Sequence, residues 1–159
     1  MVFVLLQSCM GSVVTIGGGI VGGGGAAESA ETIYMRFETD LQISIDNMET
    51  SYPGYDEYRR NIGPIGHNPY ELMGFLAVCN SFAEDEMESV LRGVFDSQYT
   101  LATTEITESR ETENEDGETV TEEVRIFDIT LTVIPFADAI APHLTAAQLE
   151  RYNQYNYSQ

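Results

Sequence analysis

The chain has 159 residues, of which 43% are hydrophobic, and it carries 26 acidic but only 7 basic residues, for a net charge of −19. This length is sufficient for one domain with a buried core. The acidic charge would repel phosphate backbones and anionic lipid head groups, so we expect no nucleic-acid partner.

The first 27 residues contain no charged side chain, and residues 1–6 are strongly apolar. A membrane-spanning helix needs about 20 predominantly apolar residues. Here, polar side chains and eight glycines after residue 10 dilute the run. We therefore interpret residues 1–29 as a truncated transmembrane segment followed by a Gly-rich linker, and residues 30–159 as an accessory α+β domain.

Two other patterns occur in the N-terminal segment. Residues 17–22 have the GxGxxG spacing of a dinucleotide-binding loop, but residues 23–29 lack the apolar stripe of the helix that must follow it. Residues 6–9 are similar to a lipobox, which would place a lipid on Cys9. The polar Gln7 and the absence of a basic start argue against lipidation. A spanning segment remains the preferred interpretation.

Helical patterns follow from residue 30 onward. Between residues 30 and 50 the apolar residues recur at helical spacing, which predicts one helix. Its stripe consists of Ile33, Phe37, Leu41, Ile45 and Met48. Asn68, Pro69 and Glu71 form an N-cap, a first-position proline and a capping-box acid, and they predict a helix over residues 69–80. Its inward side chains should be Leu72, Phe75, Leu76 and Cys79.

A second capping pair, Ser81 and Glu84, predicts another helix directly after the first. Its buried face should consist of Met87, Val90, Leu91, Val94 and Phe95. We expect these two consecutive helices to form a helical hairpin.

After Phe95 the hydrophobic period changes to two. Residues 99–110 and 119–134 are rich in Thr, Val and Ile and predict two strands. The acidic segment between them contains Asp116-Gly117, the usual dipeptide of a tight turn. Thr145 and Gln148 then form a third capping signal and predict a final helix over residues 146–155. The predicted fold class is α+β: a membrane-derived N-terminal segment and three to four helices packed with one antiparallel β-hairpin.

Residues 54–72 crowd aromatic and charged side chains around two glycine-containing turns. Tyrosine and arginine are enriched where proteins bind partners, so we consider this loop and helix start a candidate docking patch. The patch consists of Tyr55, Tyr58, Arg59, Arg60, His67 and Tyr70. An equally good alternative is that Tyr55 and Tyr58 pack on the helical hairpin while the arginines pair with its acids. His67 could instead support the start of the helix.

No catalytic, metal or cofactor site is predicted. Cys79 is the only candidate nucleophile, and its place on the apolar side of a helix is typical of a buried, inert cysteine. Two cysteines and two distant histidines make neither a disulfide nor a metal site. The acids of residues 111–118 lack the ligand spacing of a calcium loop.

Three ordered motifs, within residues 38–49, 54–72 and 95–101, give the chain a family resemblance that extends over roughly residues 36–157. It resembles the membrane-proximal region of cell-wall hydrolases carried by conjugative mobile elements of Gram-positive bacteria. In that family, an NlpC-type cysteine peptidase follows this region. The resemblance implies a fragment that precedes the catalytic domain, held at the cell membrane with its folded domain outside.

The function implied by the resemblance is that of a non-catalytic accessory domain. It would tether or dock a peptidoglycan hydrolase at the cell wall, where a type IV secretion apparatus must cross. Its partner would be the wall or a protein of the conjugation channel. Two alternatives stay open: that the region itself degrades the wall, and that it is a structural subunit of a transfer channel without a hydrolase.

Overall fold

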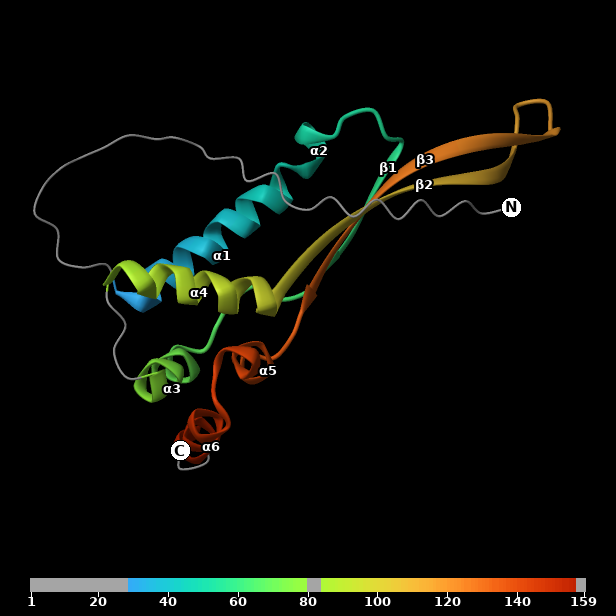
Figure 1. Ribbon diagram of the computed structural model, residues 1–159. Coiled ribbons are helices and arrows are strands. Elements are labelled where there is room, and N and C mark those ends of the chain that lie inside the picture. Colours follow the sequence, from blue (N-terminus) through green and yellow to red (C-terminus); the bar gives the residue numbers. More distant parts are fainter. Residues whose placement is uncertain (1–28, 80–83, 157–159) are drawn as a thin grey trace, which may run out of the picture. The chain divides into compact units, whose positions relative to one another are not determined.

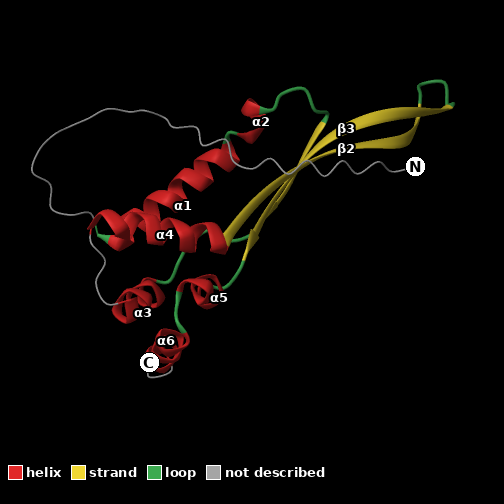
Figure 2. Cartoon of the chain, in the orientation of Figure 1, coloured by secondary structure: helices red, strands yellow, loops and turns green. Residues whose placement is uncertain are grey.

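The computed structural model describes residues 29–79 and 84–156 (Figure 1). The elements in chain order are α1 (Ala30–Asp46), α2 (Met48–Ser51), β1 (Glu57–Ile62), α3 (Pro69–Cys79), α4 (Glu84–Gln98), β2 (Tyr99–Glu113), β3 (Thr119–Val133), α5 (Phe136–Ile140), the 3-10 helix η1 (Ala141–His143) and α6 (Ala146–Asn156). The fold class is α+β, as predicted, and Figure 2 shows the helices and strands by type.

The predicted transmembrane segment and the Ser81 cap lie outside the described residues. Within the described ranges, none of the helices combines the length and the apolar character that a bilayer crossing requires.

The described residues divide into two compact units. One, the sheet unit, consists of Ser44–Gly63 and Leu101–Thr132 and contains α2, β1 and most of β2 and β3. The other, the helical unit, comprises residues 29–43, 64–79, 84–100 and 133–156. The chain passes between the two units several times, so neither is a continuous stretch of sequence.

The sheet of the sheet unit has three strands in the order β1-β3-β2. β1 runs parallel to β3, with a register from Glu57 opposite Ile126 to Ile62 opposite Leu131. The predicted sheet of one antiparallel β-hairpin is therefore incomplete, because residues 57–62, expected in a loop, form a third strand that pairs in parallel with β3. The N-terminal part of β3, residues 119–125, lies outside its pairing with β1. Figure 1 shows this part of β3 beside β2, next to the turn that connects them.

The turn between β2 and β3 is organised by Asn114. Its side-chain oxygen accepts hydrogen bonds from the backbone N–H groups of Asp116, at 3.1 Å, and Glu118, at 2.8 Å. Gly117 has a φ of +75°, a left-handed conformation that glycine adopts without steric cost. The turn at Asp116-Gly117 is confirmed, with Asn114 as an additional side-chain staple.

The core of the sheet unit follows the two-residue period of β3. Phe127, Ile129 and Leu131 are buried at every second position, and Ile126 is buried as well. From the C-terminal end of α1, Ile45 is also buried. The helix predicted over residues 30–50 is interrupted at Asn47, so that α1 and the single-turn α2 are separate.

The core of the helical unit is built from aromatic rings. Tyr34 contacts Phe37, Phe95 and Phe136 with ring centroids 5.6–6.4 Å apart, and Phe75 contacts Phe136 at 6.3 Å. Most of these pairs are edge-to-face, the arrangement that the quadrupole of aromatic rings favours.

The expected helical hairpin of α3 and α4 is not confirmed. α3 packs chiefly against α6, and α4 packs chiefly against α5. The two helices that are consecutive in sequence thus find their main partners in the C-terminal part of the chain.

Two predicted helix starts are confirmed. Asn68 caps α3 by accepting a hydrogen bond from Tyr70 N–H at 3.0 Å. At the start of α6, Thr145 N–H donates to Gln148 Oε1 at 2.9 Å, and Gln148 N–H donates to Thr145 Oγ1 at 3.3 Å. This reciprocal pair is a capping box.

Candidate functional site

Three tyrosines gather around Phe127 in the sheet unit, because the chain before β1 folds over that part of β3. Tyr52 stacks on Phe127 with ring centroids 4.9 Å apart, and Tyr55 contacts the same ring at 4.9 Å. Tyr58 lies edge-on to Phe127 and donates a hydrogen bond of 2.7 Å to Tyr52 O. Phe127 is buried beneath rings that are half-buried or, for Tyr52, 47% exposed. We call Tyr52, Tyr55 and Tyr58 the tyrosine surface.

Polar groups border the tyrosine surface. The guanidinium of Arg125 lies 4.9 Å from the Tyr55 ring centroid and donates a 3.2 Å hydrogen bond to Gly54 O. A hydrogen bond with Glu105 raises the pKa of the Tyr55 hydroxyl. The surface therefore combines aromatic rings with hydrogen-bonding groups of both charges.

Arg59 belongs to an ion-pair network across the sheet. Its guanidinium binds Glu108 through two hydrogen bonds of 2.8 and 3.0 Å and also binds Glu57 at 3.0 Å. Arg110 contacts Glu57 at 2.6 Å and Glu108 at 3.0 Å. The hydrogen bonds from Arg59 and then from Arg110 lower the pKa of Glu108 to about 2 and also lower the pKa of Glu57. These carboxylates are thereby held in the charged form.

Arg60 is also paired, with Glu49 of α2 at 2.9 Å. Both arginines pair with acids, as in the alternative to the docking patch, but that alternative is wrong about the partners, which belong to α2 and to the strands rather than to α3 and α4. Tyr55 and Tyr58 likewise pack on Phe127 of β3 instead of on a helical hairpin.

The two remaining residues of the predicted patch, His67 and Tyr70, belong to the helical unit. Tyr70 is 63% exposed, whereas the side chain of His67 is only 4% exposed. The six predicted residues thus divide between the two units. Of the two, only Tyr70 offers its side chain to solvent.

His67 joins a buried polar cluster. Its Nδ1 lies 3.0 Å from Glu38 Oε1, and its ring lies edge-on to Tyr34 at 5.0 Å. The Tyr99 hydroxyl accepts a hydrogen bond of 3.1 Å from Gly66 N–H and lies 3.2 Å from Glu38 Oε1. Burial raises the pKa of Tyr99 to about 12. The cluster fixes the segment before α3 against α1, which is a structural role that sequence spacing does not reveal.

A second buried hydrogen bond joins Tyr34 to Gln98, with the Tyr34 hydroxyl donating to Gln98 Oε1 at 2.6 Å. Burial raises the pKa of the Tyr34 hydroxyl, so it stays a donor. Neither side chain was among the predicted functional residues. In the sequence, Tyr34 lies directly after Ile33 of the apolar stripe of α1. Its hydrogen-bond partner, Gln98, is 64 residues away, so sequence spacing does not indicate the pair.

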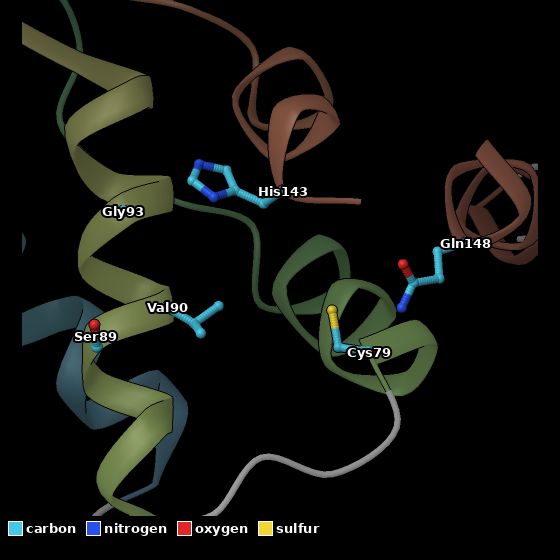
Figure 3. Close-up of a pocket in the computed structure, with 6 residues that line it drawn as sticks. All are labelled: Cys79, Ser89, Val90, Gly93, His143 and Gln148. Atoms are coloured by element: carbon cyan, nitrogen blue, oxygen red, sulfur yellow. The ribbon is translucent and has the colours of Figure 1, made fainter. Parts of the chain in front are cut away.

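A cavity of about 370 Å³ lies among α3, α4, η1 and α6 of the helical unit (Figure 3). Its lining consists of Cys79, Ser89, Val90, Gly93, His143 and Gln148. Figure 3 shows the imidazole of His143 beside α4 and the sulfur of Cys79 at the end of α3. Cys79 is therefore half-buried beside a cavity. The prediction that it is fully buried in the core is wrong.

His143, which lines the cavity, is held in place by α4. Ser97 Oγ donates to Gly93 O at 2.9 Å and lies 3.2 Å from His143 Nε2. Since Ser97 has a single hydroxyl proton, His143 Nε2 acts as the donor between them. A Cβ on residue 93 would lie 3.0 Å from His143 Cε1, so glycine makes room for the ring.

The chemistry of the cavity is that of a protonated thiol. Burial raises the pKa of Cys79, whereas a cysteine nucleophile needs a lowered one. The side-chain Nε2 of Gln148 donates a hydrogen bond of 3.2 Å to Val78 O, and its Oε1 accepts the hydrogen bond from Thr145 N–H in the capping box of α6. In the described part of the chain, no group of three His, Cys, Asp or Glu side chains could hold a metal ion.

Comparison with known proteins gives no further assignment. No protein-family profile, no curated protein and no solved structure matches the chain.

Proposed function

We propose that this chain is a non-catalytic accessory domain of a peptidoglycan hydrolase carried by a conjugative element with a type IV secretion apparatus. Residues 1–22 anchor it in the cell membrane, and its folded part lies on the extracellular side. There it tethers or docks a catalytic domain, an NlpC-type cysteine peptidase by resemblance, at the cell wall.

The observation that carries the binding role is the tyrosine surface. Tyrosine rings provide a large, rigid contact area and lose little conformational entropy when they bind. Arg125 and Glu105 next to these rings supply donors and acceptors for the hydroxyl groups of a sugar. Glycan strands of the wall present both apolar ring faces and hydroxyl groups, which fits this combination.

The pKa shifts of Glu57, Glu108 and Cys79 favour binding over hydrolysis. A glycoside hydrolase needs one carboxyl group with a raised pKa as general acid. The arginines instead lower the pKa of Glu57 and Glu108. The raised pKa of Cys79 opposes the thiolate that a cysteine peptidase requires.

Cosedimentation of the full chain with purified wall sacculi tests the proposal. Tyr52→Ala should weaken binding about tenfold or more, since central aromatic residues dominate interfaces. Tyr155→Ala is the matched control, because Tyr155 is 44% exposed but lies on α6 of the helical unit. The same affinity for both variants, or no binding by the wild type, would contradict the assigned surface.

A turbidity assay on the same sacculi separates the enzymatic alternative. We expect no clearing by the purified chain. Clearing would show that the region itself degrades the wall, and a complete coding sequence without a peptidase would favour a structural subunit of the channel.

A further inference from the structure

Helix α3 exposes a face without any charged side chain. The exposed residues are Pro69, Tyr70, Met73 and Ala77, at the three- and four-residue spacing that places side chains on one side of a helix. Tyr70 is 63% exposed and Met73 is 59% exposed. We call these four residues the outer face of α3.

This face differs from those of neighbouring helices. α4 exposes Glu86, Glu88 and Arg92, and α6 exposes Glu150 and Arg151. A helix that is apolar on all sides is normally covered on all sides. α3 is covered by α6 and α5, but its outer face is open within the described residues.

A second copy of the chain is a poor occupant for the outer face. A stable protein interface buries about 800 Å² on each partner and involves about 20 residues or more per side. The outer face consists of four residues, and the exposed surfaces of α4 and α6 are charged. A bilayer needs no such area, because an apolar patch can enter it without a complementary partner surface.

The short link between the proposed membrane anchor and Ala30 places the helical unit close to a membrane. If residues 1–22 are anchored, as in the proposed function, the seven residues before Ala30 can span at most about 25 Å. Residues 30–43 of helix α1, which starts at Ala30, belong to the same unit as α3. With a net charge of −19, the whole chain is repelled by anionic lipids, so we expect its closest approach to a membrane through a face that carries no charge of its own.

We propose that the outer face of α3 rests on the outer leaflet of the membrane, with Met73 at the acyl boundary and the hydroxyl of Tyr70 among the head groups. Tyrosine and tryptophan concentrate at this depth of a bilayer because their rings are apolar and their tips are polar. The inference depends on the membrane anchorage of the proposed function and adds the orientation of the domain.

Tryptophan reporters in the full chain test this orientation, since the chain contains no tryptophan of its own. Tyr70→Trp reports on α3, and Tyr155→Trp, at a similarly exposed tyrosine of α6, is the matched control. Each is reconstituted in phosphatidylcholine vesicles with and without brominated acyl chains. Bromine should quench the Tyr70→Trp fluorescence at least about twofold and leave the Tyr155→Trp fluorescence almost unchanged.

A charge on the outer face sharpens the test. Met73→Glu, added to the Tyr70→Trp reporter, should abolish most of the quenching, because a carboxylate resists transfer from water to the bilayer. Ala147→Glu on the exposed side of α6 should leave the quenching intact.

The outcomes separate the inference from its premise. If the chain floats with the vesicles but both reporters are quenched equally or not at all, the orientation is overturned and the anchorage survives. If the chain does not float, the anchorage fails and the orientation fails with it.

Discussion

The sheet unit and the helical unit handle polar groups in opposite ways. In the sheet unit, Arg59 and Arg110 pair with two glutamates at the surface, where water and salt screen the charges. In the helical unit, Tyr34 with Gln98 and His67 with Glu38 form hydrogen bonds away from water. Exposed ion pairs contribute little to stability, whereas a buried polar group that loses its partner keeps its full desolvation cost. Polar contacts of similar length therefore contribute unequally to stability in the two units.

The largest effect should come from removing one buried hydroxyl. Tyr34→Phe leaves Gln98 Oε1 buried without its donor, which should lower the free energy of unfolding by about 1–3 kcal/mol. Urea denaturation measures this, with Tyr70→Phe on the exposed face of α3 as the control. If the two variants lose equal stability, burial does not distinguish the units as we describe.

An intermediate effect is expected at the start of α3. Asn68→Ala removes the side-chain acceptor for Tyr70 N–H and should cost about 0.5–2 kcal/mol. Asn68→Ser keeps an N-cap oxygen and should restore most of the lost stability in the same denaturation experiment. Failure of serine to restore it would assign the loss to something other than capping.

The smallest change in stability should follow Arg59→Gln, because both side chains of the Arg59–Glu108 pair are 37% exposed and solvent screens their attraction. The pKa of Glu108 should nevertheless rise from about 2 toward 4.5. A carboxyl pKa that is lower in the folded state stabilises at neutral pH, and this contribution is lost as the pH falls through that range. As the pH falls from 4.5 to about 2, the Arg59→Gln variant should therefore lose less free energy of unfolding than the wild type.

Carboxyl NMR titration measures the Glu108 midpoint directly. Arg60→Gln is the matched control, since Arg60 pairs with Glu49 and should leave the Glu108 midpoint in place. If the titration midpoint of Glu108 is the same in the wild type and in Arg59→Gln, the pair with Arg59 does not lower the pKa of Glu108. The ion-pair network of the sheet unit would then not have the electrostatic role that we describe.

Local signals in the sequence predicted most of the helices and the turn of the sheet. Asn68, Thr145 and the Asp116-Gly117 pair act on backbone groups a few residues away, so their sequence pattern is sufficient. Strand β1 was missed because its residues, Glu57 to Ile62, show no alternation of apolar and polar side chains. It exists through parallel pairing with β3, whose residues are about 69 positions later in the chain.

The candidate site was predictable only in part, for the same reason. The sequence indicated Tyr55 and Tyr58, but not that Phe127 would be the ring beneath them. It placed His67 in a patch with Arg59, whereas His67 is buried in the other unit, where it contacts Glu38 and Tyr34. Adjacency in sequence does not fix a common surface when a unit boundary falls between Gly63 and Pro64.

The interleaved course of the chain has a consequence for biosynthesis. α3 is made early, but its main packing partner α6 is the last of the described elements to be made. During translation the apolar side of α3 that α6 will cover must wait for about 70 further residues, several seconds at ordinary rates of synthesis. The helical unit is therefore completed only after residues 146–156 have left the ribosome, and the nascent chain is most vulnerable to aggregation just before that point.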